Sequence, residues 1–279
     1  MARRRSDPQL PYSDLDPSRW REYPEIWTGS LWEIPARARG NGHALDYHGN
    51  FVPQIATQTF QRYARRGEVV LDLFLGSGTS AVEAVRLGRR CIGVELRPEL
   101  IEQVRAKVPA ESVALIEGDS TAPETEERVR GALGEWGLTH ADLLVLHPPY
   151  GDIIRFSDRP ECLSNALSTR QFLERFRAAA CRGHALLAAG RFAVLVIGDR
   201  YSRGELVPLG FLCMQVMNEV GFRTRSIVVK NIEGNEVGKG RANNLWRYRA
   251  LRGGFYIFKH EYVMIFDRPA ARPRRGRAG

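Results

Sequence analysis

Two short stretches carry the residue types that chemistry on a nucleoside requires. Gly76-Ser77-Gly78 follows an apolar run that begins at Val69, and Glu95 lies 19 residues after Gly76. A glycine turn lets a ligand approach the backbone, and the N-terminus of a following helix offers free N–H groups. An acid at the end of the next strand accepts hydrogen bonds from ribose hydroxyls. The first stretch therefore predicts a nucleoside-binding half-fold.

Asp72 narrows the class of nucleoside ligand. It lies inside the first predicted strand, two residues before the end of that strand. An anion there repels a pyrophosphate but suits a cationic ligand, such as a sulfonium that carries an amino-acid head. Gly76-x-Gly78-x-x-Ala81 also matches a dinucleotide fingerprint, so a nicotinamide oxidoreductase is an alternative, whereas the absence of Gly-Lys-Ser/Thr excludes a P-loop. The alternative role for Asp72 is to bind only the N–H groups of the turn.

The second stretch, His147-Pro148-Pro149-Tyr150, directly follows the almost wholly apolar run 141–146. This places it at the carboxyl end of the fourth predicted strand, beside the point where open α/β sheets bind ligands. Two prolines fix the backbone, hold one carbonyl outward and remove two N–H donors. Hydrogen bonds to both hydrogens of an exocyclic amine free its lone pair for attack, and Tyr150 is placed to stack on a flipped base. A Pro-Pro turn without chemistry is the alternative.

Together these stretches resemble the S-adenosylmethionine-dependent class I methyltransferases, and among them the DNA amino-methyltransferases that act on N4 of cytosine or N6 of adenine. The resemblance covers about residues 48 to 267. The stretch LDLFLGSGT is similar to their cofactor motif, Asp-Pro-Phe-x-Gly-Ser-Gly-Thr, with Leu73 in place of proline. His48-Gly-Asn-Phe51, with Pro53, resembles the segment that packs on the methionine end. The resemblance implies S-adenosylmethionine as cofactor, Glu95 on its ribose and Asp119 near its adenine amino group, within a cofactor site of His48, Phe51, Pro53, Asp72, Phe74, Gly76, Ser77, Gly78, Thr79, Glu95 and Asp119.

The tetrapeptide HPPY occupies the place of the family's catalytic motif, so the resemblance implies catalytic roles for His147, Pro148, Pro149 and Tyr150. The family usually has Asp, Asn or Ser where this chain has His147. A neutral imidazole accepts one hydrogen bond and can take up the proton that methyl transfer releases. Because the Asp usual in adenine enzymes is absent, we favour N4 of cytosine over N6 of adenine. An RNA base amine and a non-catalytic DNA-binding protein remain alternatives.

The elements that must position these residues follow from apolar runs and helical spacing. Strands are predicted at 69–74, 91–94, 113–116, 141–146, 192–197, 224–230 and 262–266, and helices at 53–66, 79–87, 98–108, 123–136, 168–189 and 206–220. Strands that are apolar on both faces indicate a parallel sheet covered by helices. We therefore predict an α/β, Rossmann-like class I methyltransferase fold, with a seven-stranded, mostly parallel sheet, an antiparallel last strand and helices on both faces.

Composition limits the partners. The chain has 279 residues and a net charge of +9, and only four of its 41 basic residues are lysine. Codon bias in a GC-rich genome accounts for part of the arginine excess, but the net charge itself favours a polyanion, most simply double-stranded DNA. Four scattered cysteines without a CxxC pair fit a reduced, cytoplasmic protein, and no metal site is expected. The resemblance to DNA methyltransferases implies a nucleoid-associated protein of a prokaryote. No apolar run approaches membrane length.

DNA contacts are expected outside the predicted strands. Residues 1–45 read as an arm whose aromatic residues cover the main domain, 46–267 as the catalytic domain, and 268–279 as a basic tail. Loops at 151–167 and 231–256 are the candidate recognition loops. Residues 223–252 contain eight basic residues against two acids: Arg223, Arg225, Lys230, Lys239, Arg241, Arg247, Arg249 and Arg252. The predicted DNA contacts are Arg155, Ser157, Arg159, Lys239, Arg241, Trp246, Arg247 and Arg249.

Three further expectations concern neighbours and partners. His260-Glu261, just before the last predicted strand, is expected to support the active site rather than to catalyse. Asp199 is expected at the same edge of the sheet, where it would orient the cofactor or His147. So small a chain has no room for a separate recognition domain, so a second copy of the chain is a candidate partner, as is a companion restriction endonuclease.

Overall fold

A mixed sheet of eight strands forms the centre of the molecule. The computed structural model describes residues 10–38, 49–149, 157–202, 204–232 and 243–270, with backbone only at 243–246. The strands lie in the order β1-β9-β10-β6-β5-β2-β3-β4. Their bounds are β1 Leu31–Trp32, β2 Val69–Asp72, β3 Arg90–Glu95, β4 Val113–Glu117, β5 Ala141–Leu146, β6 Leu187–Ile197, β9 Arg223–Asn231 and β10 His260–Asp267. Only β10 is antiparallel to its two neighbours, β6 and β9.

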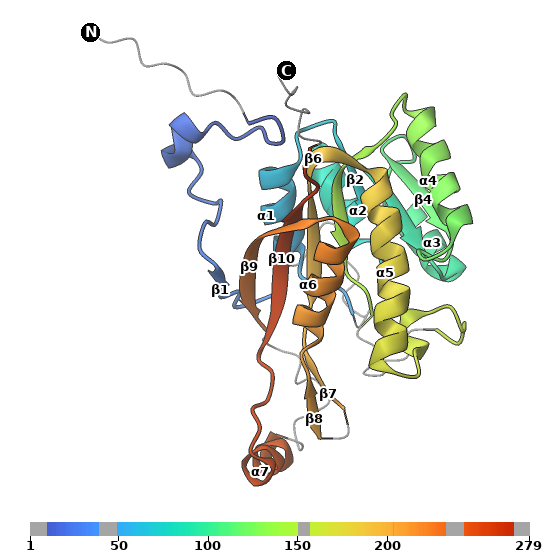
Figure 1. Ribbon diagram of the computed structural model, residues 1–279. Coiled ribbons are helices and arrows are strands. Elements are labelled where there is room, and N and C mark those ends of the chain that lie inside the picture. Colours follow the sequence, from blue (N-terminus) through green and yellow to red (C-terminus); the bar gives the residue numbers. More distant parts are fainter. Residues whose placement is uncertain (1–9, 39–48, 150–156, 203, 233–242, 271–279) are drawn as a thin grey trace, which may run out of the picture.

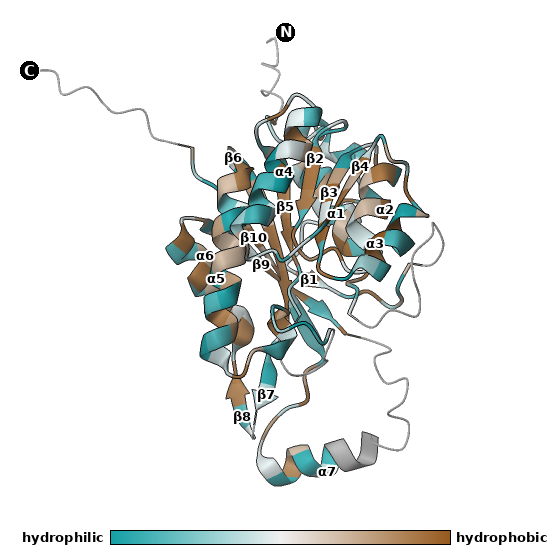
Figure 2. Ribbon diagram, turned by 90° about the vertical axis from the view of Figure 1, so that its right-hand side faces the viewer, coloured by the Kyte–Doolittle hydropathy of each residue, from teal (hydrophilic) through white to brown (hydrophobic). Residues whose placement is uncertain are grey.

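Helices cover both faces of this sheet. Figure 2 shows the brown, apolar strands between α1, α2 and α3 on one side and α4, α5 and α6 on the other. Their bounds are α1 Pro53–Tyr63, α2 Thr79–Arg86, α3 Pro98–Arg105, α4 Pro123–Glu135, α5 Thr169–Leu186 and α6 Leu209–Val220, with short 3-10 turns η1 Pro17–Glu22 and η3 Leu163–Asn165. Ser168 caps α5 by accepting a hydrogen bond from Gln171 N, and Gly221 ends α6 in the left-handed conformation.

Side chains of each central strand alternate between two apolar cores. In β5, Leu143 and Val145 pack on the α1 side, whereas Leu144 and Leu146 pack on the α5 side. Because successive side chains of a strand point to opposite faces, one continuous apolar run serves both cores. The predicted class I methyltransferase fold is therefore confirmed, including the antiparallel last strand.

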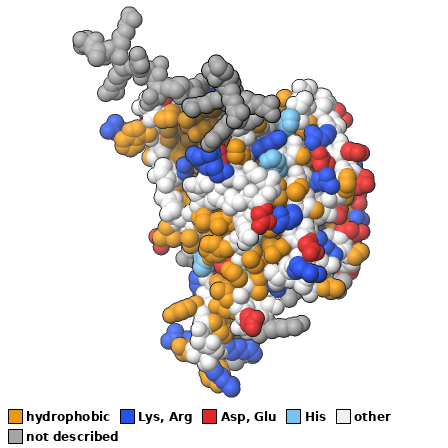
Figure 3. Space-filling model, viewed as in Figure 1, with side chains coloured by type: hydrophobic (Ala, Val, Ile, Leu, Met, Phe, Trp, Pro, Cys, Tyr) orange, Lys and Arg blue, Asp and Glu red, His pale blue; other side chains and the backbone are white. Residues whose placement is uncertain are grey.

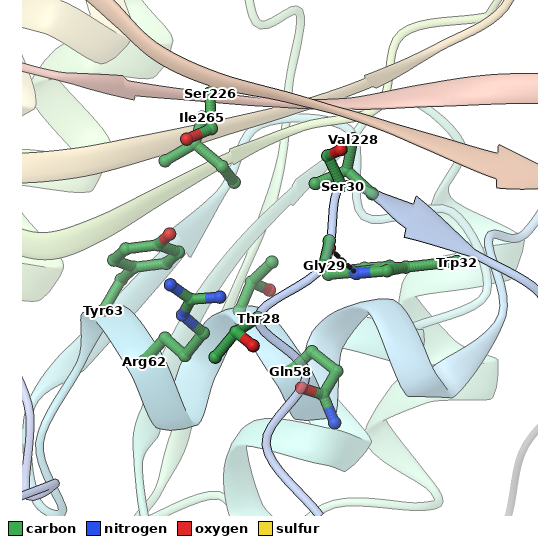
Figure 4. A pocket seen from close by; sticks show the side chains of 11 residues that line it. Thr28, Gly29, Ser30, Trp32, Gln58, Arg62, Tyr63, Ser226, Val228 and Ile265 are labelled. Atoms are coloured by element: carbon green, nitrogen blue, oxygen red, sulfur yellow. Dashed lines mark hydrogen bonds between the residues drawn. The ribbon is translucent and has the colours of Figure 1, made fainter. Parts of the chain in front are cut away.

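The sheet has eight strands where seven were predicted. The additional strand is β1, which pairs in parallel with β9 through Leu31 and Trp32. A two-residue strand shows no periodicity, and its partner is about two hundred residues away in the chain. In this N-terminal segment the Trp27 and Trp32 rings pack 5.3 Å apart. A cavity of about 70 Å³ lies between the segment, α1 and β9, and Figure 4 shows its lining side chains.

Several element bounds differ from the predictions. Helix α5 ends at Leu186, so residues 187–190 are strand, because β6 extends along the edge of β5 at Ala141. Residues 206–207 lie not in a helix but in β8 Glu205–Val207, which forms a hairpin with β7 Arg200–Ser202. Part of the predicted loop 231–256 is a helix, α7 Asn243–Gly253. Figure 1 shows that the hairpin and α7 extend away from the body of the molecule.

No helix within the described ranges is both long and apolar enough to cross a membrane.

Candidate cofactor and target-base site

The glycine turn lies between β2 and α2 and is shaped by close packing. Gly76 and Gly78 have φ values of 56° and 91°, which favour glycine. A Cβ atom on Gly78 would lie 2.7 Å from Val104 Cγ2 of α3, so a larger residue would also displace that helix. The turn is tied to the sheet by the Leu75 N–H, which donates to the Val94 carbonyl at 2.9 Å. The backbone of the turn is thus held in one conformation, and Ser77 and Thr79 are adjacent to its two glycines.

Asp72 is buried beneath this turn, with only 1% of its surface exposed. Its carboxylate accepts hydrogen bonds from Phe74 N at 2.9 Å and from Ser80 Oγ at 2.5 Å. Burial raises the pKa of Asp72 to about 6, against the effect of these two hydrogen bonds. The contacts seen here join the end of β2 to α2. The predicted contact with a cationic ligand remains a prediction.

Glu95 ends β3 opposite the turn, and it fits the role of a ribose acceptor. One carboxylate oxygen accepts from Gly76 N at 2.9 Å and the other from Arg97 N at 3.0 Å. An ionised carboxylate can accept about four hydrogen bonds, so two acceptor positions remain for a diol. Burial raises the pKa of Glu95. The predicted contact of Glu95 with a ribose remains a prediction.

Asp119 follows β4 at the same edge of the sheet. Its two carboxylate oxygens accept from the backbone N–H and the hydroxyl of Thr121, each at 2.8 Å. The adjacent Ser120 donates to the carbonyl of Leu73. The loop after β4 is thereby joined to the end of β2, which brings Asp119 into the line of strand ends that contains Glu95.

The segment before the cofactor motif reaches both predicted sites. Arg37 Nη1 donates to the carbonyls of Asn50 and Phe51 at 3.1 Å each, and the Asn50 amide donates to Ser77 Oγ in the glycine turn. The Phe51 ring lies 5.3 Å from the His147 ring in an edge-to-face contact. Phe51 and Pro53 are buried. A segment far from His147 in sequence therefore connects the cofactor turn with the tetrapeptide.

His147 is half-buried at the carboxyl end of β5, next to the buried Pro148. Burial lowers the pKa of His147 to about 4; the charge of Glu261 raises it and that of Lys230 lowers it. The imidazole is therefore neutral at physiological pH and can accept one hydrogen bond. Pro149 is also half-buried.

A set of polar side chains that the sequence did not identify as a group surrounds this end of β5. Lys230 and Glu261 form a buried ion pair, with 2.9 Å between Nζ and Oε1. Lys230 is thus not available for phosphate contact, because its side chain is only 6% exposed. The pairing of β9 with β10 places Lys230 opposite Glu261. The sequence alone did not predict this pair, because only the antiparallel register brings the two residues together.

Asp199, after β6, has a structural role at the same edge. It accepts from Gly210 N at 2.9 Å and from the Tyr262 hydroxyl at 3.0 Å. Burial and the Asp199 carboxylate raise the pKa of Tyr262 to about 12. His260 Nε2 lies 3.2 Å from the same hydroxyl. His260 and Glu261 belong to β10 itself, which begins two residues earlier than predicted, and they pair with Asn231 and Lys230 of β9.

The predicted DNA contacts fall into two groups. Ser157 and Arg159 line an open cavity of about 610 Å³ together with residues 97–99, on the cofactor side of the sheet edge. Arg247 and Arg249 are exposed on α7, on the side of β6 and β10. Arg223 instead pairs with Asp267 at 2.6 Å. Outside the described residues or side chains lie His48, Tyr150, Arg155, Lys239, Arg241 and Trp246.

Comparison with known proteins agrees with this geometry. Residues 4–106 match the family described as DNA methylase, of the N6/N4 type. The chain is similar to the type II methyltransferase M2.DpnII of Streptococcus pneumoniae, with 31% identity over 93 residues, which cover 33% of this chain and 32% of that protein. It is similar to the ribosomal protein L11 methyltransferase of Dechloromonas aromatica (strain RCB), with 30% identity over 143 residues, or 49% of this chain and 45% of that protein.

A TehB-like SAM-dependent methyltransferase from Corynebacterium glutamicum is a structural neighbour, with a TM-score of 0.45 and 17% identity over 77% of this chain and 87% of that chain. In the two sequence relatives the similar segment is less than half of the protein. The tetrapeptide at 147–150 lies beyond the segment 4–106. Its role therefore rests on its residues and on its place in the fold.

Proposed function

We propose that the chain is an S-adenosylmethionine-dependent DNA amino-methyltransferase, which methylates the exocyclic amine of a flipped DNA base, with N4 of cytosine favoured over N6 of adenine. The match of residues 4–106 to the N6/N4 DNA methylase family supports this proposal. One observation carries the proposal. The glycine turn and the tetrapeptide end two neighbouring parallel strands, in which Asp72 pairs with Val145. Both therefore open at the same edge, and Phe51 lies against His147 between them.

The bound cofactor supplies a methyl group activated on a sulfonium. The chain's own residues then have three tasks. Gly76 to Thr79 and Glu95 hold the nucleoside, while Asn50 braces the turn through Ser77. His147 and the Pro148 carbonyl accept the two amine hydrogens, which frees the lone pair for in-line attack. Such orientation, with acceptors fixed in advance, accounts for catalysis in this arrangement.

His147 is also placed to take up the proton that must leave the methylated nitrogen. Its pKa of about 4 keeps the imidazole neutral before transfer, which is the protonation state that a proton acceptor requires. The Lys230–Glu261 pair and Tyr262 support this end of the sheet without contacting the amine themselves. The target side of the edge is thus β5, β6 and β10, and the cofactor side is β2, β3 and β4.

The test is transfer of labelled methyl groups from S-adenosylmethionine to unmethylated genomic DNA. Digestion to nucleosides and mass spectrometry would show N4-methylcytosine, and sequencing would map the methylated site. N6-methyladenine would support the second candidate base. Label that enters structured RNA or ribosomal protein, but not DNA, would overturn the proposal.

A further inference from the structure

Tyr256 is an exposed aromatic residue on an ordered support. It is 89% exposed, whereas the rings of Phe255 and Phe258 each lie 4.9 Å from the Tyr201 ring. The Tyr201 hydroxyl donates to the Tyr256 carbonyl at 3.1 Å. The backbone of Tyr256 is therefore held from both sides, while its own ring is left in solvent.

The support connects Tyr256 with the edge of the sheet that carries His147. Tyr201 belongs to the β7–β8 hairpin, which directly follows β6 and whose base is anchored by Arg200 Nη2, 3.2 Å from Thr169 Oγ1 of α5. Strand β10 begins only four residues after Tyr256, at His260. Four extended residues span about 13 Å. Figure 1 shows that α7, which directly precedes the segment of Tyr256, lies beyond the ends of β9 and β10.

The segment that carries Tyr256 is basic. Residues 243–260 contain no acidic residue, and they include Arg247, Arg249, Arg252 and Lys259. The neighbouring hairpin contributes the exposed Glu205, and Figure 3 shows blue Lys and Arg side chains beside orange apolar ones, with red acidic atoms among them, at this end of the molecule. This charge complements a phosphate backbone, and so it identifies duplex DNA as the partner of the exposed ring.

We propose that Tyr256 inserts its ring into the DNA stack next to the target base and stabilises the extruded state. The inference rests on the proposed function, because an enzyme acting on a base amine must take that base out of the helix. Aromatic side chains inserted between base steps unstack them, and stacking on an aromatic ring shifts binding by about 5- to 150-fold. The Tyr256 ring thus replaces the stacking interactions that the neighbouring bases lose when the target base leaves the helix.

The test uses two duplexes that contain the mapped site, one fully paired and one with a mismatch opposite the target base. Single-turnover methyl transfer is measured with Tyr256→Ala, Tyr256→Phe and the wild type. Tyr256→Ala should slow transfer on the paired duplex about 5- to 150-fold, and the mismatch should restore most of the rate, because a mismatched base is easier to extrude. Tyr256→Phe keeps the ring and should resemble the wild type.

Trp20→Ala is the matched control, since Trp20 is another exposed aromatic residue, at 63%, on η1. It should leave both rates unchanged. Wild-type rates for Tyr256→Ala on the paired duplex, or an equal loss on both duplexes, would overturn the inference. A wild-type protein that methylates neither duplex would instead overturn the proposed function, and the inference with it.

Discussion

At the scale of single residues, the site combines a neutral base with buried acids. His147 has a pKa of about 4, and Asp72 has a pKa of about 6. Both shifts have burial as their largest cause, although Asp72 is fully buried and His147 only half-buried. Perturbed groups of this kind in one place are typical of functional sites. The two residues have different tasks, which substitutions separate.

The first prediction concerns His147. Replacement by Ala should lower methyl transfer about 10²- to 10³-fold, because one acceptor for the amine is lost. His147→Asn should retain more activity, since an amide oxygen can accept the same hydrogen bond. Single-turnover rates and cofactor binding by calorimetry would be compared. If His147→Ala also abolished cofactor binding, its role as a target-side acceptor would be wrong.

The second prediction concerns the pH dependence of stability. The folded-state pKa of Asp72, about 6, is above the ordinary value of 3.8, so the native state binds more protons between these values. Protonation of Asp72 therefore stabilises the native state fully below about pH 4, and this contribution is lost as pH rises through 6. The free energy of unfolding should fall by about 3 kcal/mol over this range, at about 1.4 kcal/mol per pH unit. Asp72→Asn should remove this slope. Urea unfolding without cofactor from pH 4 to 7 measures it, and parallel curves for the two proteins would contradict it.

At the scale of elements, the carboxyl edge of the sheet is divided into two halves. The turn at 157–160 lies beside the start of α3, near Glu95, and Arg159 is 3.4 Å from Glu117 at the end of β4. The segment that directly follows α7 is joined instead to the β7–β8 hairpin, by contact of Phe255 with Tyr201. The described parts of the two candidate recognition loops therefore lie at different halves of the edge, although both loops were predicted to contact DNA.

This division predicts that substitutions of two arginines weaken the binding of different ligands. Arg159→Gln should weaken cofactor binding several-fold and leave DNA affinity nearly unchanged, because Arg159 faces the cofactor side. Arg247→Gln should weaken DNA binding and reduce the slope of log affinity against log salt by about one, with no change in cofactor affinity. Calorimetry with the cofactor and fluorescence anisotropy with duplex DNA at several salt concentrations would show this. A loss of DNA affinity in both variants would instead support the original prediction for Arg159.

At the scale of the whole molecule, one sheet separates two apolar cores. Ile55 of α1 and Ile92 of β3 are 1% and 0% exposed, and they belong to different cores. The strands shared by both cores make the domain one structural unit. The N-terminal segment extends this unit by adding β1 to β9.

The matched substitutions Ile55→Val and Ile92→Val should each lower the free energy of unfolding by about 0.5–1.5 kcal/mol. Their effects should add within about 0.5 kcal/mol, since the two side chains share no core neighbours. Urea unfolding of both single variants and the double variant tests this. Two separate transitions, or a coupling well above that limit, would contradict a single cooperative unit with two cores.

The sequence by itself determined the sheet, the glycine turn and the place of HPPY, because apolar runs, glycines and prolines act over a few neighbouring residues. Only the tertiary structure revealed β1, the Lys230–Glu261 pair and the support of Tyr256 by Tyr201. Each of these joins segments that are distant in the chain, so it depends on strand register and packing, which no local pattern encodes.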